Sequence, residues 1–67
     1  MVAQAKRRVI KSGPSSRVIV LPLDWCEGSG LAPGTEVSVR YGRLLLVVPP
    51  GGESQADRLI RAIGGSL

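Results

Sequence analysis

The sequence predicts a small, mostly β domain with one short helix after the second strand, a helical tail, and a core shared by two copies of the chain. With 67 residues there is room for one small domain. One Cys and no His exclude an intrachain disulfide and the usual zinc site, so another stabilising device is needed. Residues 18–21 and 44–48 are apolar on both faces, which one short helix cannot cover. We therefore expect an intertwined two-fold homodimer or a higher oligomer built from it, with a monomeric barrel as the alternative.

The first two strands are expected at residues 7–11 and 17–21. In the first, β-branched Val9 and Ile10 lie between charged residues, and a Ser-Gly-Pro sequence ends the strand. The second is apolar after its first residue and stops at Pro22.

A short helix is expected to begin at Pro22, because proline suits the first helical position. Asp24 and Glu27 suit the positive N-terminal end of the helix, and two glycines end it after one or two turns. Trp25 lies one helical turn from Leu21 and is expected to cap the core.

Two further strands are expected at residues 36–41 and 43–48. Before them, Pro33 and Gly34 are typical of a type II turn, in which proline fixes one φ and glycine supplies a positive φ. Valine and tyrosine alternate with polar residues in the third strand, which predicts one apolar face. Gly42 makes the tight turn to the fourth strand, which two prolines end.

The sequence divides into a domain at residues 1–50 and a tail at residues 51–67, which opens with a flexible Gly-rich break. Ser54 is expected to open a capping box with Asp57, followed by a helix of about ten residues. Such a helix is marginal alone, so its apolar stripe should pack on its own barrel, on another subunit or on a second protein. The stripe residues expected at that contact are Leu59, Ile60 and Ile63, on the same side as Ala56.

Charge is concentrated at one end of the chain. The net charge is +4, and the first 20 residues hold no acid. The remaining residues carry four Arg against five acids. This asymmetry favours a polyanion-binding surface over a general solubility charge. The five basic residues of the first 20 are Lys6, Arg7, Arg8, Lys11 and Arg17.

An enzyme is not expected, and no cofactor or metal is predicted. Without His there is no Ser-His or Cys-His pair to activate a nucleophile, and the five acids are scattered. The apolar runs are far shorter than the roughly 18 residues of a membrane span. No apolar targeting segment follows the basic N-terminal region, so the expected location is cytoplasmic.

Three separated motifs, in this order, resemble the AbrB/MazE/SpoVT DNA-binding domain, and the resemblance covers about residues 7–48. They read Lys11-x-Gly13-x-Ser15-x-x-Val18-x-x-Leu21-Pro22-x-x-Trp25, then Gly30-Leu31-x-Pro33-Gly34-x-x-Val37, then Gly42-Arg43-Leu44. Val20 and Leu23 stand where the family often has polar residues, so the short helix is expected to face a protein partner more than DNA.

The resemblance implies a swapped-hairpin β-barrel formed by an intertwined homodimer, with the first hairpins presented to double-stranded DNA. It implies a transcriptional regulator of the nucleoid that selects DNA by sequence or shape. An antitoxin-like protein, whose residues 53–67 bind a toxin while the barrel regulates its own promoter, is the alternative, and an RNA-binding barrel is a weaker one. The resemblance places DNA contacts at Arg7, Arg8, Lys11, Ser15, Ser16 and Arg17.

Overall fold

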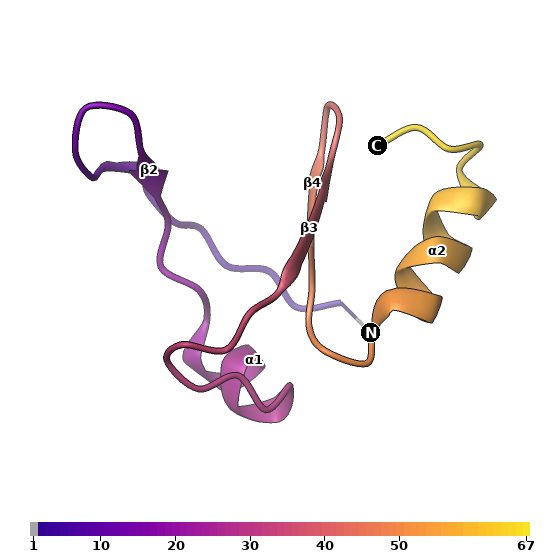
Figure 1. Ribbon diagram of the computed structural model, residues 1–67, viewed down its shortest axis with the longest axis horizontal. Coiled ribbons are helices and arrows are strands. Elements are labelled where there is room, and N and C mark those ends of the chain that lie inside the picture. Colours follow the sequence, from indigo (N-terminus) through magenta and orange to yellow (C-terminus); the bar gives the residue numbers. More distant parts are fainter. Residues whose placement is uncertain (1) are drawn as a thin grey trace. The chain divides into compact units, whose positions relative to one another are not determined.

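A computed structural model describes residues 2–67 as two antiparallel two-stranded sheets and two helices (Figure 1). The chain divides into two compact units, the first ending at Gly30 and the second running over Leu31–Leu67. The first unit holds the order β1, β2, α1, and the second holds β3, β4, α2. Residues 51–67 therefore belong to the same unit as the second hairpin.

The first unit is a short hairpin followed by a helix. Strands β1 (Ile10–Lys11) and β2 (Arg17–Val18) are antiparallel. Both are shorter than predicted, and their residues are exposed, as are the flanking apolar residues of the predicted strands. No side chain described in this unit is buried. A two-stranded hairpin without a covered face is marginally stable, which is consistent with its short pairing.

Helix α1 (Leu23–Gly28) forms where it was predicted, with Pro22 as its N-cap and not its first residue. The main-chain N–H of Trp25 donates to Asp24 Oδ1 at 3.0 Å in the first turn. Glu27 lies near the C-terminal end of the helix, so its predicted place at the positive N-terminal end is wrong. The Trp25 side chain is half-buried.

The second unit begins with the predicted Pro-Gly turn. The N–H of Thr35 donates to the carbonyl of Ala32 at 3.0 Å, and Gly34 has φ +92°, as a type II turn requires. Strands β3 (Ser38–Tyr41) and β4 (Leu45–Val48) then pair in an antiparallel hairpin.

Helix α2 (Glu53–Ala62) packs on β4, as Figure 1 shows, and this contact contains the core of the unit. Val48 and Ala56, with 2% and 6% of their surface exposed, are the buried hydrophobic side chains of the described chain. Because Arg40 lies opposite Leu46 and Ser38 opposite Val48, these four side chains share the face toward the helix. Val39, Tyr41, Leu45 and Val47 form the other face, here called the bare face.

The predicted flexible break before α2 is a defined turn. The N–H of Gly52 donates to the carbonyl of Pro49 at 2.9 Å, and Gly51 has φ +86°. The turn makes Gly52 the N-cap, with no side-chain capping hydrogen bond. Ser54 lies inside the helix, so the predicted capping box is wrong. The start of α2 is therefore set by the backbone turn before it, without a side-chain cap.

After α2 the chain returns to the β3–β4 turn. The N–H of Arg43 donates to the carbonyl oxygen of Leu67 at 2.7 Å. A Cβ on Gly42 would lie 3.0 Å from the same oxygen, so a larger residue here would require Leu67 to shift.

The described chain is thus mixed α/β, with helices of 6 and 10 residues against strands of 2, 2, 4 and 4. The prediction of a mostly β chain is corrected, because both strands of the first hairpin are only two residues long. Residues 2–67 form two separate hairpins and no closed barrel. Within the same residues no helix is long and apolar enough to cross a membrane.

Candidate nucleic-acid interface

The β1–β2 hairpin carries two basic side chains at one position of its ladder. Lys11 lies directly opposite Arg17, as Ile10 lies opposite Val18. Directly opposite residues of an antiparallel pair point to the same face, with Cβ atoms about 5 Å apart. Two positive charges are therefore neighbours on one exposed face of the hairpin.

No ion pair within the described residues of the first unit compensates these two charges. Between residues 2 and 67 the structure has one ion pair, Arg40 Nη1 to Asp57 Oδ1 at 2.7 Å, and it belongs to the second unit. Like charges directly opposite each other destabilise a hairpin. The Lys11–Arg17 pair is therefore a position where an external anion is favoured.

The loop between the strands adds hydrogen-bond donors. The N–H of Ser12 donates to the carbonyl of Ser16 at 3.0 Å and closes the loop, in which Gly13 has φ +77°. In the described chain the amides of Gly13, Ser15 and Ser16 donate to no backbone carbonyl. Together with the exposed serine hydroxyls, they can donate to phosphate oxygens, as loop amides and serines do in protein–DNA complexes.

Three arginines of the predicted site differ in their contacts. The Nε of Arg7 donates to the carbonyl of Val20, and its Nη1 donates to the carbonyl of Lys6, both at 3.0 Å. The Nη1 of Arg17 donates to the carbonyl of Ser16 at 3.0 Å. Arg8 is exposed and makes no side-chain hydrogen bond within residues 2–67. The structure therefore gathers Lys11, Ser15, Ser16 and Arg17 on the hairpin, while Arg7 and Arg8 precede β1.

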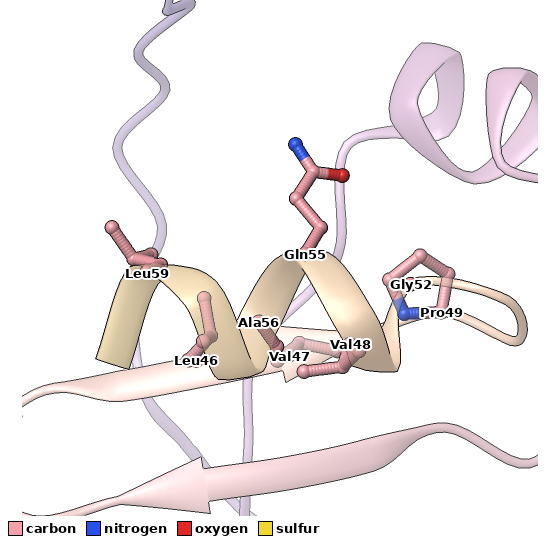
Figure 2. Close-up of a pocket in the computed structure, with 8 residues that line it drawn as sticks. All are labelled: Leu46, Val47, Val48, Pro49, Gly52, Gln55, Ala56 and Leu59. Carbon is pink, nitrogen blue, oxygen red and sulfur yellow. The ribbon is translucent and has the colours of Figure 1, made fainter. Parts of the chain in front are cut away.

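The apolar stripe predicted on the tail helix is partly buried and partly exposed. Ala56 is buried against β4, Ile60 is half-buried, and Leu59 and Ile63 keep 48% and 45% of their surface exposed. A groove of about 170 Å³ lies between α2 and β4, where the Leu59 and Leu46 side chains lie near one another and that of Gln55 points away from the strand (Figure 2). The residues that line it are Leu46, Val47, Val48, Pro49, Gly52, Gln55, Ala56 and Leu59.

The ion pair between Arg40 and Asp57 is not predicted by the sequence pattern. The two residues are 17 positions apart, and the pattern of neither segment indicates the other. Nor does the sequence pattern predict the hydrogen bond from Arg7 to Val20, which joins residues 13 positions apart.

Among the described residues no group of three or more His, Cys, Asp or Glu side chains could hold a metal ion. Cys26 is a half-buried free thiol in α1.

No protein-family model, curated protein or solved structure matches this chain. The resemblance to the AbrB/MazE/SpoVT domain thus stays a prediction, and the interface rests on geometry and charge.

Proposed function

We propose that the protein is a dimeric regulator of transcription that binds double-stranded DNA through its β1–β2 hairpin. The observation that carries this proposal is the cross-strand pair Lys11 and Arg17, which lies on an exposed face and forms no ion pair within the described residues of its own unit. A phosphate backbone relieves the repulsion between these charges and accepts their hydrogen bonds. Arginine can fork onto a phosphate or a guanine edge, whereas lysine supplies a point charge.

Duplex DNA fits the hairpin better than single-stranded RNA does. Recognition of single strands relies on aromatic side chains on which bases stack. The chain has one Trp, one Tyr and no Phe. Trp25 is half-buried in α1, and Tyr41 belongs to the second unit, so the hairpin itself offers no stacking surface.

A second copy of the chain would supply the missing core. Ordering one residue costs about 1–2 kcal/mol of conformational entropy, and burying one large apolar side chain returns about 1.5–3 kcal/mol. The two buried side chains, Val48 and Ala56, cannot offset that cost for the whole chain. Apart from half-buried Val47, the bare face remains exposed, as do the apolar residues around β2, with Tyr41 at 77% and Val20 at 60%. We propose that they pack in an intertwined, swapped-hairpin barrel, which would bring two basic hairpins to one two-fold surface.

An antitoxin-like role is the second candidate, because Leu59 and Ile63 leave an apolar stripe exposed on α2. It ranks lower because the helix is already held on the second hairpin, by buried Ala56 against β4 and by the Arg40–Asp57 pair to β3. A reading frame for a toxin-like protein directly downstream of the gene would favour it.

The decisive experiment is a binding titration against duplex DNA, the matching single strands and RNA at several salt concentrations. If a dimer neutralises about six phosphates, log affinity falls with log salt with a slope of about −5 on duplex DNA. A slope near zero, or a preference for RNA, would overturn the proposal.

Two double variants that remove the same charge from different parts of the chain test which surface binds DNA. The double variant Lys11→Gln, Arg17→Gln should lose most duplex binding and reduce the slope. The control Arg58→Gln, Arg61→Gln removes the same charge from α2 and should bind nearly as the parent does. Equal losses in both variants would mean that net charge, and not the hairpin, drives binding.

The dimer has its own test in sedimentation equilibrium. Val39→Lys places a charge on the bare face and should give a monomer, while Val2→Lys, at a residue 94% exposed, should leave a dimer. A monomeric parent protein would remove the swapped-hairpin barrel from the proposal.

A further inference from the structure

Arg7 differs from the other basic residues of the first unit in what its guanidinium contacts. Its Nε–H donates to the carbonyl oxygen of Val20, on the far side of the hairpin, at 3.0 Å. Its Nη1 donates to the carbonyl of Lys6, also at 3.0 Å. The first bond spans 13 residues and joins the segment before β1 to the segment after β2.

These bonds limit what Arg7 can offer to DNA. A guanidinium grips a phosphate best with two parallel donors on one edge. The edge formed by Nε and Nη2 is not open in Arg7, because Nε donates to Val20, and Nη1 of the other edge already donates to Lys6. Arg17 also donates to a carbonyl, that of Ser16, but it uses Nη1 and its Nε–Nη2 edge stays open.

The neighbours of Arg7 are not restrained in this way. The side chains of Lys6 and Arg8 are exposed and donate no hydrogen bond within the described residues. A bond that fixes the backbone between them limits the positions that both side chains can reach.

We infer that Arg7 is a positioning residue that ties the basic N-terminal segment to the hairpin, and that Lys6 and Arg8 are the phosphate-contacting residues of this segment. The inference rests on the proposed DNA-binding function and changes the predicted site, in which Arg7 was itself a contact. The tie lowers the entropy that Lys6 and Arg8 lose on binding, because their backbone is ordered before DNA arrives.

Charge-preserving variants distinguish positioning from contact. Arg7→Lys keeps the positive charge but removes the Nε–H and the planar fork. It should weaken duplex binding about tenfold, the worth of one hydrogen bond from a charged donor, and leave the salt slope unchanged. Arg7→Gln should behave in the same way.

Arg8 provides the matched comparison, since it is the next residue and has the same side chain. Arg8→Lys should keep both affinity and slope, whereas Arg8→Gln should reduce the slope by about 0.9 for each chain of the dimer. If Arg7→Lys binds as the parent does while Arg7→Gln loses slope, Arg7 is a phosphate contact and the inference is wrong.

A measurement without DNA separates this inference from the proposed function. In the free protein, a scalar coupling across the hydrogen bond between Arg7 Nε and the carbonyl carbon of Val20 should be observable by NMR. Arg7→Lys should then raise the backbone mobility of residues 6–8, while Arg8→Lys leaves it unchanged. Absence of the coupling, or equal backbone mobility of residues 6–8 in both variants, would show that Arg7 does not hold this segment on the hairpin. Absence of duplex binding by a protein that shows the coupling overturns the proposed function alone.

Discussion

The two hairpins of this chain differ in what covers them. β1–β2 pairs over two residues per strand and has no buried side chain. β3–β4 pairs over four residues per strand and has a helix on one face. Both are rich in β-branched and aliphatic residues, so strand propensity does not explain the difference. The longer ladder belongs to the hairpin whose apolar side chains find partners within the chain.

The difference also divides the work of the molecule as we propose it. The covered hairpin has a compensated charge, Arg40 with Asp57, and the uncovered hairpin has an uncompensated one, Lys11 with Arg17. Compensation within the chain stabilises a fold, whereas a missing counter-charge leaves a place for a ligand.

The largest expected loss of stability comes from disrupting the packing of α2 on β4. Ala56→Arg would force a charge into the contact between α2 and β4 and should cost about 3 kcal/mol of the stability of that contact. Circular dichroism and amide exchange should show α2 unfolded or detached. Gln55→Arg, at the adjacent exposed position, should leave the helix protected. A protected α2 in both variants would show that the helix contact does not depend on Ala56.

A smaller loss is expected from Val48→Ala, which removes two methyl groups from the most buried side chain and should cost about 2 kcal/mol. Val39→Ala, on the bare face and 45% exposed, should cost less than about 0.5 kcal/mol at low protein concentration. Denaturant unfolding at two protein concentrations measures both. If a second copy covers the bare face, the cost of Val39→Ala rises with concentration. Equal costs at low concentration would contradict the burial difference.

Reversing one charge of the uncovered hairpin should stabilise it and weaken binding. Lys11→Glu turns the cross-strand repulsion into an attraction worth about 0.5 kcal/mol. Amide exchange of residues 10–18 should slow, while duplex affinity falls by at least tenfold. Lys11→Gln is the control and should stabilise the hairpin less. Faster amide exchange of these residues in the Lys11→Glu variant would show that repulsion between Lys11 and Arg17 does not destabilise the hairpin.

The smallest effect is expected from the ion pair of the covered hairpin. Asp57→Asn should cost no more than about 0.5 kcal/mol, because the Arg40 and Asp57 side chains are 32% and 50% exposed. The loss should shrink at high salt. A double-mutant cycle with Arg40→Gln isolates the pair energy. A coupling well above 1 kcal/mol would show that the pair, and not Ala56, holds α2 on the sheet.

Local chemistry made several elements predictable. Gly34 has the positive φ that its turn requires, and α1 begins after the predicted proline and ends at the first of the two predicted glycines. The order of strands and helices also follows from the sequence pattern. These features depend on residues within one turn of each other, where intrinsic preferences decide the conformation.

Contacts between distant segments were not predictable in the same way. The alternation in β3 identified an apolar face, yet α2 packs on the opposite face, beside Arg40 and Ser38. The long aliphatic stem of an arginine can line an apolar contact while its guanidinium reaches a carboxylate, which a hydropathy pattern does not register. In the candidate interface, the sequence shows that Lys11 and Arg17 are basic, but their direct opposition depends on the register that the loop sets.

The division of the chain also distributes its aromatic residues, with Trp25 in the first unit and Tyr41 in the second. Each unit therefore contains one intrinsic fluorophore, because the chain has a single Trp and a single Tyr. Selective excitation of tryptophan reports on the surroundings of α1 alone, and tyrosine emission reports on the bare face. The two units therefore carry distinct intrinsic reporters in one unlabelled sample, Trp25 for changes around α1 and Tyr41 for changes on the bare face.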